Sequence, residues 1–299
     1  MSINYHNQNH STGASSLKRS PSSKRNVIGL VMNCLVFACV GLALLPLLAV
    51  LFYVIAQGAS RINFSVFTEL PPPPMVQGGG FGNAILGTLI MVGIAALISI
   101  PFGVLAAIYL TEFSSGQVAK WSRFATNVLS GVPSIIVGVF AYGIIVLTTR
   151  TYSAWAGGFA LAILMLPIIV RTTDEALQLV PNDLRQAAVG LGATDFQSVF
   201  KVVLPAALPA IITGATLAIA RAAGETAPLL FTALFTQFWP NWSNHLVEPT
   251  ASLAVLVYNF ATVPFKNQQE LAWAASFILV FLVLVTSVIA RLATARRVY

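Results

Sequence analysis

Residues 83–109 read NAILGTLIMVGIAALISIPFGVLAAIY and contain no charged side chain. A helix needs about 20 apolar residues to cross the hydrocarbon core of a bilayer, so this segment is long enough to cross it once. Similar segments lie at residues 28–56, 125–147, 154–170, 206–223 and 271–290. The sequence therefore predicts an all-α integral membrane protein with six transmembrane helices.

The composition agrees with lipid as the main solvent of this chain. Of its 299 residues, 57% are hydrophobic and 8% are charged, whereas soluble domains carry about 25% charged residues. The net charge is +7, but lysine and arginine are scattered between the apolar segments instead of lining one face. This distribution argues against a nucleic-acid partner.

Lysine and arginine also predict the orientation, because they concentrate in cytoplasmic loops. With the N-terminus inside, the external loops receive only Arg61, Arg150 and Lys266. The cytoplasmic side then receives Lys18, Arg19, Lys24, Arg25, Lys120, Arg123, Arg171, Arg185, Lys201, Arg291, Arg296 and Arg297. Both termini are therefore expected in the cytoplasm.

Two polar stretches flank or interrupt the predicted spans. Residues 1–26 are rich in serine and asparagine and are expected to form a disordered cytoplasmic tail, which leaves residues 27–299 as one transmembrane domain. Residues 226–270 form a long external segment. Within it, residues 227–238 are apolar but too short to cross cleanly, so we expect a helix end or a re-entrant piece.

The predicted internal loop at residues 171–205 is hydrophilic but carries signals for helices. Asp183 with Gln186, and Thr194 with Gln197, follow the spacing of helix-start capping pairs. The Gly-Leu-Gly sequence between the two starts can turn the chain. We therefore expect two short helices joined at an angle by glycine.

Arg221 lies within the predicted span at residues 206–223, and Glu225 lies just beyond its end. They are four residues apart and therefore share one face of a helix. A charge at bilayer depth costs at least about 2.5–3.5 kcal/mol and is a functional hypothesis by default. The alternative is a structural pair that closes a helix–helix contact.

Gly131, Pro133 and Gly138 interrupt the third predicted span. Proline removes a backbone hydrogen bond, and glycine allows helices to approach closely. We interpret these three residues as packing residues, with a role in lining a pathway as the alternative.

Seven residues of the internal loop keep a fixed spacing: Gln186, Ala187, Ala188, Gly192, Val202, Leu204 and Pro205. This spacing resembles the EAA loop of ABC importer permeases, in which Glu-Ala-Ala precedes Gly by three residues and Ile-x-Leu-Pro follows nine residues later. Gln186 stands where that family has Glu, and Val202 where it has Ile. The resemblance implies a coupling helix that docks into a groove of an ATPase subunit, with small side chains allowing close approach.

Four further segments resemble the phosphate-specific permeases of ABC importers: residues 87–89 (GTL), 101–110 (PFGVLAAIYL), 131–138 (GVPSIIVG) and 221–233 (RAAGETAPLLFTA). The resemblance covers the chain from about residue 80 to its end. It implies a type I ABC importer permease fold in a bacterial cytoplasmic membrane. Arg221 would then be the cation of the phosphate pathway, and Glu225 would hold it when phosphate is absent.

The resemblance also implies partners. They are a second related permease that completes a heterodimer, an ATP-binding cassette ATPase dimer and a periplasmic phosphate-binding protein. ATP and Mg²⁺ would be bound by the ATPase, so this chain itself is expected to hold no cofactor and to be no enzyme. In agreement, no lysine is followed by serine or threonine as a P-loop requires. His6, His10 and His245 are isolated, so no metal site is expected.

Two alternatives stay open from the sequence alone. The anion could be sulfate or molybdate instead of phosphate. Less favoured is an ion-coupled secondary transporter, which would need buried carboxylates or internal repeats. Of such carboxylates the predicted spans offer only Glu225.

Overall fold

The structure is a computed structural model, and it describes residues 24–114, 116–244 and 246–295. All regular elements within these ranges are helical. The α-helices are α1 (Lys24–Ala59), α2 (Ser65–Thr68), α3 (Gly82–Ile108), α4 (Gln117–Ser130), α5 (Ser134–Ala141), α6 (Leu147–Thr149), α7 (Ala154–Gln178), α8 (Asn182–Gly190), α9 (Asp195–Ser198), α10 (Leu204–Ala223), α11 (Ala227–Thr232), α12 (Leu253–Ala261) and α13 (Lys266–Ala295). Three π-helical turns join some of them: η1 (Tyr109–Phe113), η2 (Tyr142–Val146) and η3 (Val199–Val203).

The chain divides into two units, Met1–Tyr53 and Val54–Tyr299. The described part of the first unit is most of α1, a helix whose described side chains in this unit are all exposed. A helix that is apolar on every side suits contact with lipid. The expected disordered tail at residues 1–26 lies outside the described residues, except that α1 begins at Lys24.

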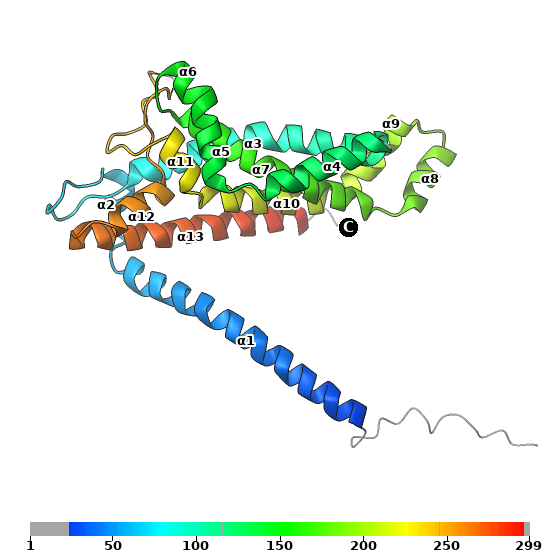
Figure 1. The fold of residues 1–299 in the computed structure, drawn as a ribbon, viewed down its shortest axis with the longest axis horizontal. Coiled ribbons are helices and arrows are strands. Elements are labelled where there is room, and N and C mark those ends of the chain that lie inside the picture. Colours follow the sequence, from blue (N-terminus) through cyan, green and yellow to red (C-terminus); the bar gives the residue numbers. More distant parts are fainter. Residues whose placement is uncertain (1–23, 115, 245, 296–299) are drawn as a thin grey trace, which may run out of the picture. The chain divides into compact units, whose positions relative to one another are not determined.

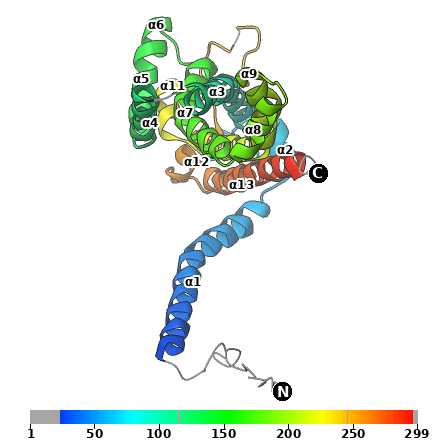
Figure 2. The same cartoon turned by 90° about the vertical axis from the view of Figure 1, so that its right-hand side faces the viewer.

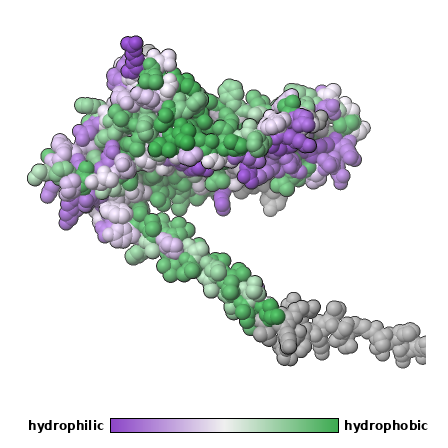
Figure 3. All heavy atoms as spheres, viewed as in Figure 1, coloured by the Kyte–Doolittle hydropathy of each residue, from purple (hydrophilic) through white to green (hydrophobic). Residues whose placement is uncertain are grey.

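The second unit is built around long helices that pack side by side. α3 packs against α7, α7 against α10, and α10 against α13 (Figures 1 and 2). Met91, Leu161, Met165 and Ile169 form the centre of this core. Hydrophilic residues gather at the two ends of the unit, with a hydrophobic band between them (Figure 3). The arrangement suits a protein whose middle lies in lipid.

α3 and α7 run in the same direction. Gly158 of α7 lies against Ile94 of α3, and further along both helices Gly103 of α3 lies against Ile169 of α7. Both helices therefore end at the same end of the unit, where α8 and α9 also lie (Figure 1).

The predicted third span at residues 125–147 is not one straight helix. The chain bends by 100° between Gln117–Ser130 and Ser134–Thr149. Proline has no N–H to continue the helix, and the residue before it avoids helical dihedrals, so Pro133 ends α4 and starts α5. Of the described helices, five are long and apolar enough to cross a membrane, and six spans result if the bent pair counts as one.

The internal loop at residues 171–205 is shorter than expected, because residues 171–178 continue α7. The predicted capping pair of Asp183 and Gln186 is wrong. A cap at Asp183 would start the helix at Leu184, but α8 begins two residues earlier, at Asn182, and Pro181 occupies the cap position without a side-chain cap. Proline is tolerated there because a helix has no partner for the N–H groups at its start.

The capping box of Thr194 and Gln197 is confirmed, with the Gln197 N–H donating to the Thr194 hydroxyl at 3.3 Å. The helix that it starts is not short, however. It runs through η3 into α10, so that Asp195–Ala223 forms one candidate span. The wide turn η3 lies just before Pro205, whose ring cannot be accommodated in a regular helical turn.

The long segment at residues 226–270 also contains more helix than expected. α11 begins at Ala227, where an apolar helical piece was predicted, but it ends at Thr232. α12 was not predicted. The Ser252 hydroxyl caps it by accepting from the Val255 N–H, and it packs against α13.

Gly138→Ala tests the contact that holds the bent segment. A Cβ atom at Gly138 would lie 2.6 Å from the Pro228 Cα atom of α11. We expect this substitution to lower the free energy of unfolding by about 1–3 kcal/mol, because backbone must move to relieve the clash. Gly143→Ala is the matched control, since nothing lies within 4 Å of its Cβ position. Thermal unfolding in detergent measures both, and equal midpoints would contradict the prediction.

Cysteine labelling tests the predicted orientation. Cys34 and Cys39 are replaced by serine, and single cysteines are placed at two exposed residues, Leu191 and Phe238. Leu191 directly follows α8, whereas the Phe238 carbonyl accepts a hydrogen bond from the Asn83 side chain at the start of α3. A membrane-impermeant maleimide should label Phe238→Cys in intact spheroplasts, and Leu191→Cys only after permeabilisation. The reverse pattern would show that the orientation is wrong.

Candidate functional site

Arg221 and Glu225 form an ion pair at the end of α10. The Arg221 Nε atom lies 3.4 Å from the Glu225 Oε1 atom. α10 ends at Ala223, and the N–H groups of Gly224 and Glu225 bond back to the carbonyls of Arg221 and Ala222. The two predicted residues are therefore brought together across the end of a helix, not along its face.

The two partners differ in accessibility. The side chain of Arg221 is 55% exposed, whereas that of Glu225 is 16% exposed. Good charge-assisted hydrogen bonds measure about 2.7–2.9 Å, so a contact of 3.4 Å is a weak one. The guanidinium can therefore leave its partner and meet a ligand, while the carboxylate stays in place. A guanidinium fork matches the oxygens of a tetrahedral oxyanion.

The pair lies beside a break between two helices, and a second break packs nearby. The chain is interrupted between α10 and α11 and again between α4 and α5. α5 packs against α11, with buried Gly138 on the backbone of Pro228. Gly131 and Pro133 are exposed. Gly138 is thus a packing residue, whereas Gly131 and Pro133 are exposed at the bend between α4 and α5.

The residues of the EAA-like loop do not share one surface. Gln186 and Ala187 are exposed on α8, but Ala188 is buried, and α8 packs against η3. Leu204 is partly buried, and Pro205 is exposed at the start of α10. The small size of Ala188 therefore serves packing inside the chain, contrary to its expected place on the docking face.

The backbone conformation at position 192 explains why glycine occupies it. Its φ angle is +87°, a value that side chains disfavour, and no atom lies within 4 Å of its Cβ position. Large apolar side chains are exposed on the surrounding turn: Leu184, Val189, Leu191 and Phe196. Contiguous apolar surface at a polar end of the molecule is typical of a protein–protein contact.

Two inter-helix ion pairs at this end were missed in the sequence. Arg123 of α4 binds Asp174 of α7 through Nε and a terminal nitrogen, both at 2.9 Å. Arg185 of α8 binds Glu112 of η1 at 2.8 Å and 3.3 Å. The partners are 51 and 73 residues apart, so no local spacing could have indicated these pairs.

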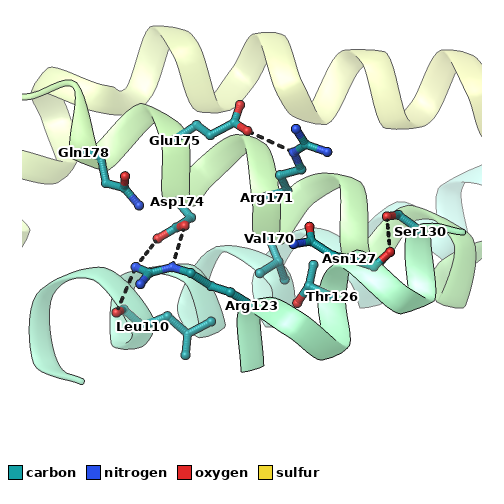
Figure 4. Close-up of a pocket in the computed structure, with 10 residues that line it drawn as sticks. All are labelled: Leu110, Arg123, Thr126, Asn127, Ser130, Val170, Arg171, Asp174, Glu175 and Gln178. Carbon is teal, nitrogen blue, oxygen red and sulfur yellow. Dashed lines mark hydrogen bonds and ion pairs between the residues drawn. The ribbon is translucent and has the colours of Figure 1, made fainter. Parts of the chain in front are cut away.

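A cavity of about 590 Å³ lies between α4 and α7 (Figure 4). Its polar lining includes Arg123, Arg171, Asp174 and Glu175. Arg123 is bound to Asp174, and Arg171 to Glu175 at 2.9 Å. The four charges cancel, so this hollow has no excess positive charge to attract an anion. Arg221, by contrast, is more than half exposed and has one carboxylate partner.

In the part of the chain that the structure describes, no three or more His, Cys, Asp or Glu side chains lie together so that they could hold a metal ion. The candidate site has an exposed guanidinium, a shielded carboxylate and two breaks between helices.

Known proteins share both the sequence and the fold. Residues 99–298 match the family "Binding-protein-dependent transport system inner membrane component". The phosphate transport system permease protein PstA of Yersinia pestis is 40% identical over 281 residues, which are 94% of this chain and 93% of that protein. PstA of Haemophilus influenzae is 43% identical over 244 residues, 81% of this chain and 85% of that protein.

Among solved structures, a chain of a bacterial alginate ABC transporter, crystallised with an alginate-bound periplasmic protein, has a similar fold. The TM-score is 0.65 at 16% identity, and the match covers 93% of this chain and 98% of that one. At this identity the likeness concerns the fold alone.

Proposed function

The chain belongs to the family of binding-protein-dependent transport system inner membrane components, and from this premise we propose how it moves its substrate. Its relatives are phosphate transport system permeases along nearly the whole chain, so it is the permease subunit of a phosphate ABC importer. It has the all-α type I importer permease fold and is a transport component without an ATPase site of its own.

Arg221 is the residue that meets phosphate on its way through the membrane in this proposal. The supporting observation is its weak pairing: a guanidinium more than half exposed, held at 3.4 Å by one carboxylate beside a helix break. Discontinuous helices are the usual place of substrate sites in transporters, because the break exposes backbone and side chains to the pathway.

Glu225 supplies the reverse step. When phosphate arrives, its oxygens take the guanidinium donors that Glu225 had held. When phosphate leaves, the carboxylate recaptures the arginine. Conduction needs a site that is attractive enough for entry and weak enough for release. A competing carboxylate within reach gives that balance without a large movement of the protein.

The permease works with another permease, an ATPase and a substrate-binding protein, as its family implies. More specifically, we propose a heterodimer with a related permease, an ATPase dimer that binds ATP and Mg²⁺, and a periplasmic phosphate-binding protein. The exposed apolar turn around α8 supports the ATPase contact, with Gln186, Ala187 and Gly192 on its surface. No observation favours sulfate, molybdate or ion coupling over phosphate.

Ala187→Arg tests the docking of α8. A long charged side chain on an exposed position should block close approach of the ATPase without disturbing the packing of this chain. We expect the variant to insert into the membrane but to lose the ATPase on co-purification, while Ala187→Ser keeps it. Ala188 is not suitable for this test, because it is buried. Retention of the ATPase by Ala187→Arg would show that the face is no docking site.

Variants of Arg221 test the pathway. Arg221→Gln should lower phosphate uptake at least about tenfold, roughly 1.4 kcal/mol, even when Glu225→Gln removes the carboxylate left unpaired. Arg221→Lys should keep partial activity, because it retains the charge without the fork. The matched control is Arg171→Gln with Glu175→Gln, another pair four residues apart. Uptake is measured in vesicles with assembly checked by co-purification. Normal uptake by the doubly neutral Arg221 variant would reduce the pair to a structural role.

A further inference from the structure

We propose that Arg185 and Glu112 form a strut that transmits displacement of α8 to the ends of α3 and α7. The inference rests on the proposed function, in which α8 is the helix that contacts the ATPase. It assigns these two side chains as positioning residues that couple ATP hydrolysis to movement of the membrane helices.

Arg185 bridges three elements through one guanidinium. It binds both carboxylate oxygens of Glu112 in η1, which continues α3, at 2.8 Å and 3.3 Å. It also donates to the backbone carbonyls of Leu177 and Val180 at the end of α7, the former at 2.9 Å. A planar fork with this many fixed acceptors holds one geometry, so α8 cannot shift without pulling on both helices.

The pair is shielded, which makes it a firm connection. The side chains of Arg185 and Glu112 are 22% and 9% exposed. Low exposure strengthens the attraction between the charges, and loss of one partner would leave the other charge poorly solvated. The pair of Arg171 and Glu175 differs both in its exposure and in joining residues of a single helix. It is 61% and 59% exposed, and it lies within α7, so it connects no two elements.

The neighbouring residue extends the connection. Thr111 precedes Glu112 in η1 and donates its hydroxyl to Asp174 of α7 at 2.6 Å. The same carboxylate holds Arg123 of α4. Two adjacent residues of η1 thus contact α7, α8 and, through Asp174, α4. This places the π-helical turn at the junction of the elements that end here.

Without the strut, α8 would be tied mainly to the following helix. Ala188 is buried, and α8 packs against η3, which runs directly into α10. A displaced α8 would then reach α3 and α7 only indirectly, through the apolar packing of η3 and α10 against their ends and through the short link between α7 and α8. Arg185 and Glu112 add a direct polar attachment of α8 to the ends of both helices.

The test is the ratio of phosphate imported to ATP hydrolysed, measured with the whole transporter and its loaded binding protein in vesicles. We expect Glu112→Gln and Arg185→Lys to assemble and hydrolyse ATP but to lower this ratio about fivefold or more, the lower range of coupling between sites. The double variant Glu112→Gln with Arg185→Gln should lower the ratio at least as far as Glu112→Gln alone, because it also removes the bonds from Arg185 to the carbonyls of Leu177 and Val180. Arg171→Gln with Glu175→Gln is the matched control and should keep the ratio.

Other results of the same measurement would contradict the inference. If the variants fail to assemble, or lower transport and hydrolysis in the same proportion, the pair only maintains the fold and the inference is wrong. An unchanged ratio in Glu112→Gln would also overturn it. Failure of the proposed function is a separate result, since then the wild-type transporter itself would not import phosphate in these vesicles.

Discussion

Backbone polar groups cannot stay unpaired in hydrocarbon, and this constraint governs the whole structure. It requires helices wherever the chain meets lipid, as in α1, α3, α7, α10 and α13. It also restricts where helices can stop within the membrane. At the two breaks, at Gly131–Pro133 and after Ala223, backbone N–H groups bond back to carbonyls three residues earlier. Beyond the breaks, α5 and α11 pack against each other through Gly138 and Pro228. Arg221 and Glu225 lie on either side of the end of α10, so the irregular backbone after Ala223 belongs to the ion pair itself.

The charges obey a related constraint. A charge near lipid is costly unless it is paired or reaches water. At the end where α3 and α7 stop, four charged side chains that lie in different elements solve this problem by pairing across those elements: Arg123 with Asp174, and Arg185 with Glu112. The pairing removes the cost of each charge and fixes the helix ends to one another. Helix ends fixed in this way suit the ATPase contact that we propose for this end.

Features encoded by local pattern could be predicted from the sequence. The apolar segments, the capping box of Thr194 and Gln197, and the closeness of Arg221 to Glu225 all depend on residues a few positions apart. The spans and the capping box were found because helix geometry relates spacing to contact. The Arg221–Glu225 contact was expected on one face of a helix, but the helix ends between the two residues.

Features that depend on tertiary contacts could not be predicted. The Arg185–Glu112 pair joins residues 73 positions apart, and the burial of Ala188 depends on how α8 rests on η3. The single span expected at residues 125–147 ignored the combined effect of glycine and proline on the helix. The cap expected at Asp183 was wrong because the helix starts two residues earlier, with Pro181 at the cap position.

Arg221 and Arg185 carry the same side chain but have different surroundings, and this difference suits them to different roles. Arg221 has one carboxylate partner at 3.4 Å and a side chain 55% exposed, so a competing anion can reach it and displace the partner. Arg185 has a shielded carboxylate, two backbone carbonyls and little exposure, so an anion in water could not replace these fixed acceptors. An exchangeable contact suits a substrate that must leave, and a permanent contact suits the transmission of movement. The difference lies in exposure and in the number of acceptors, since the charge is the same.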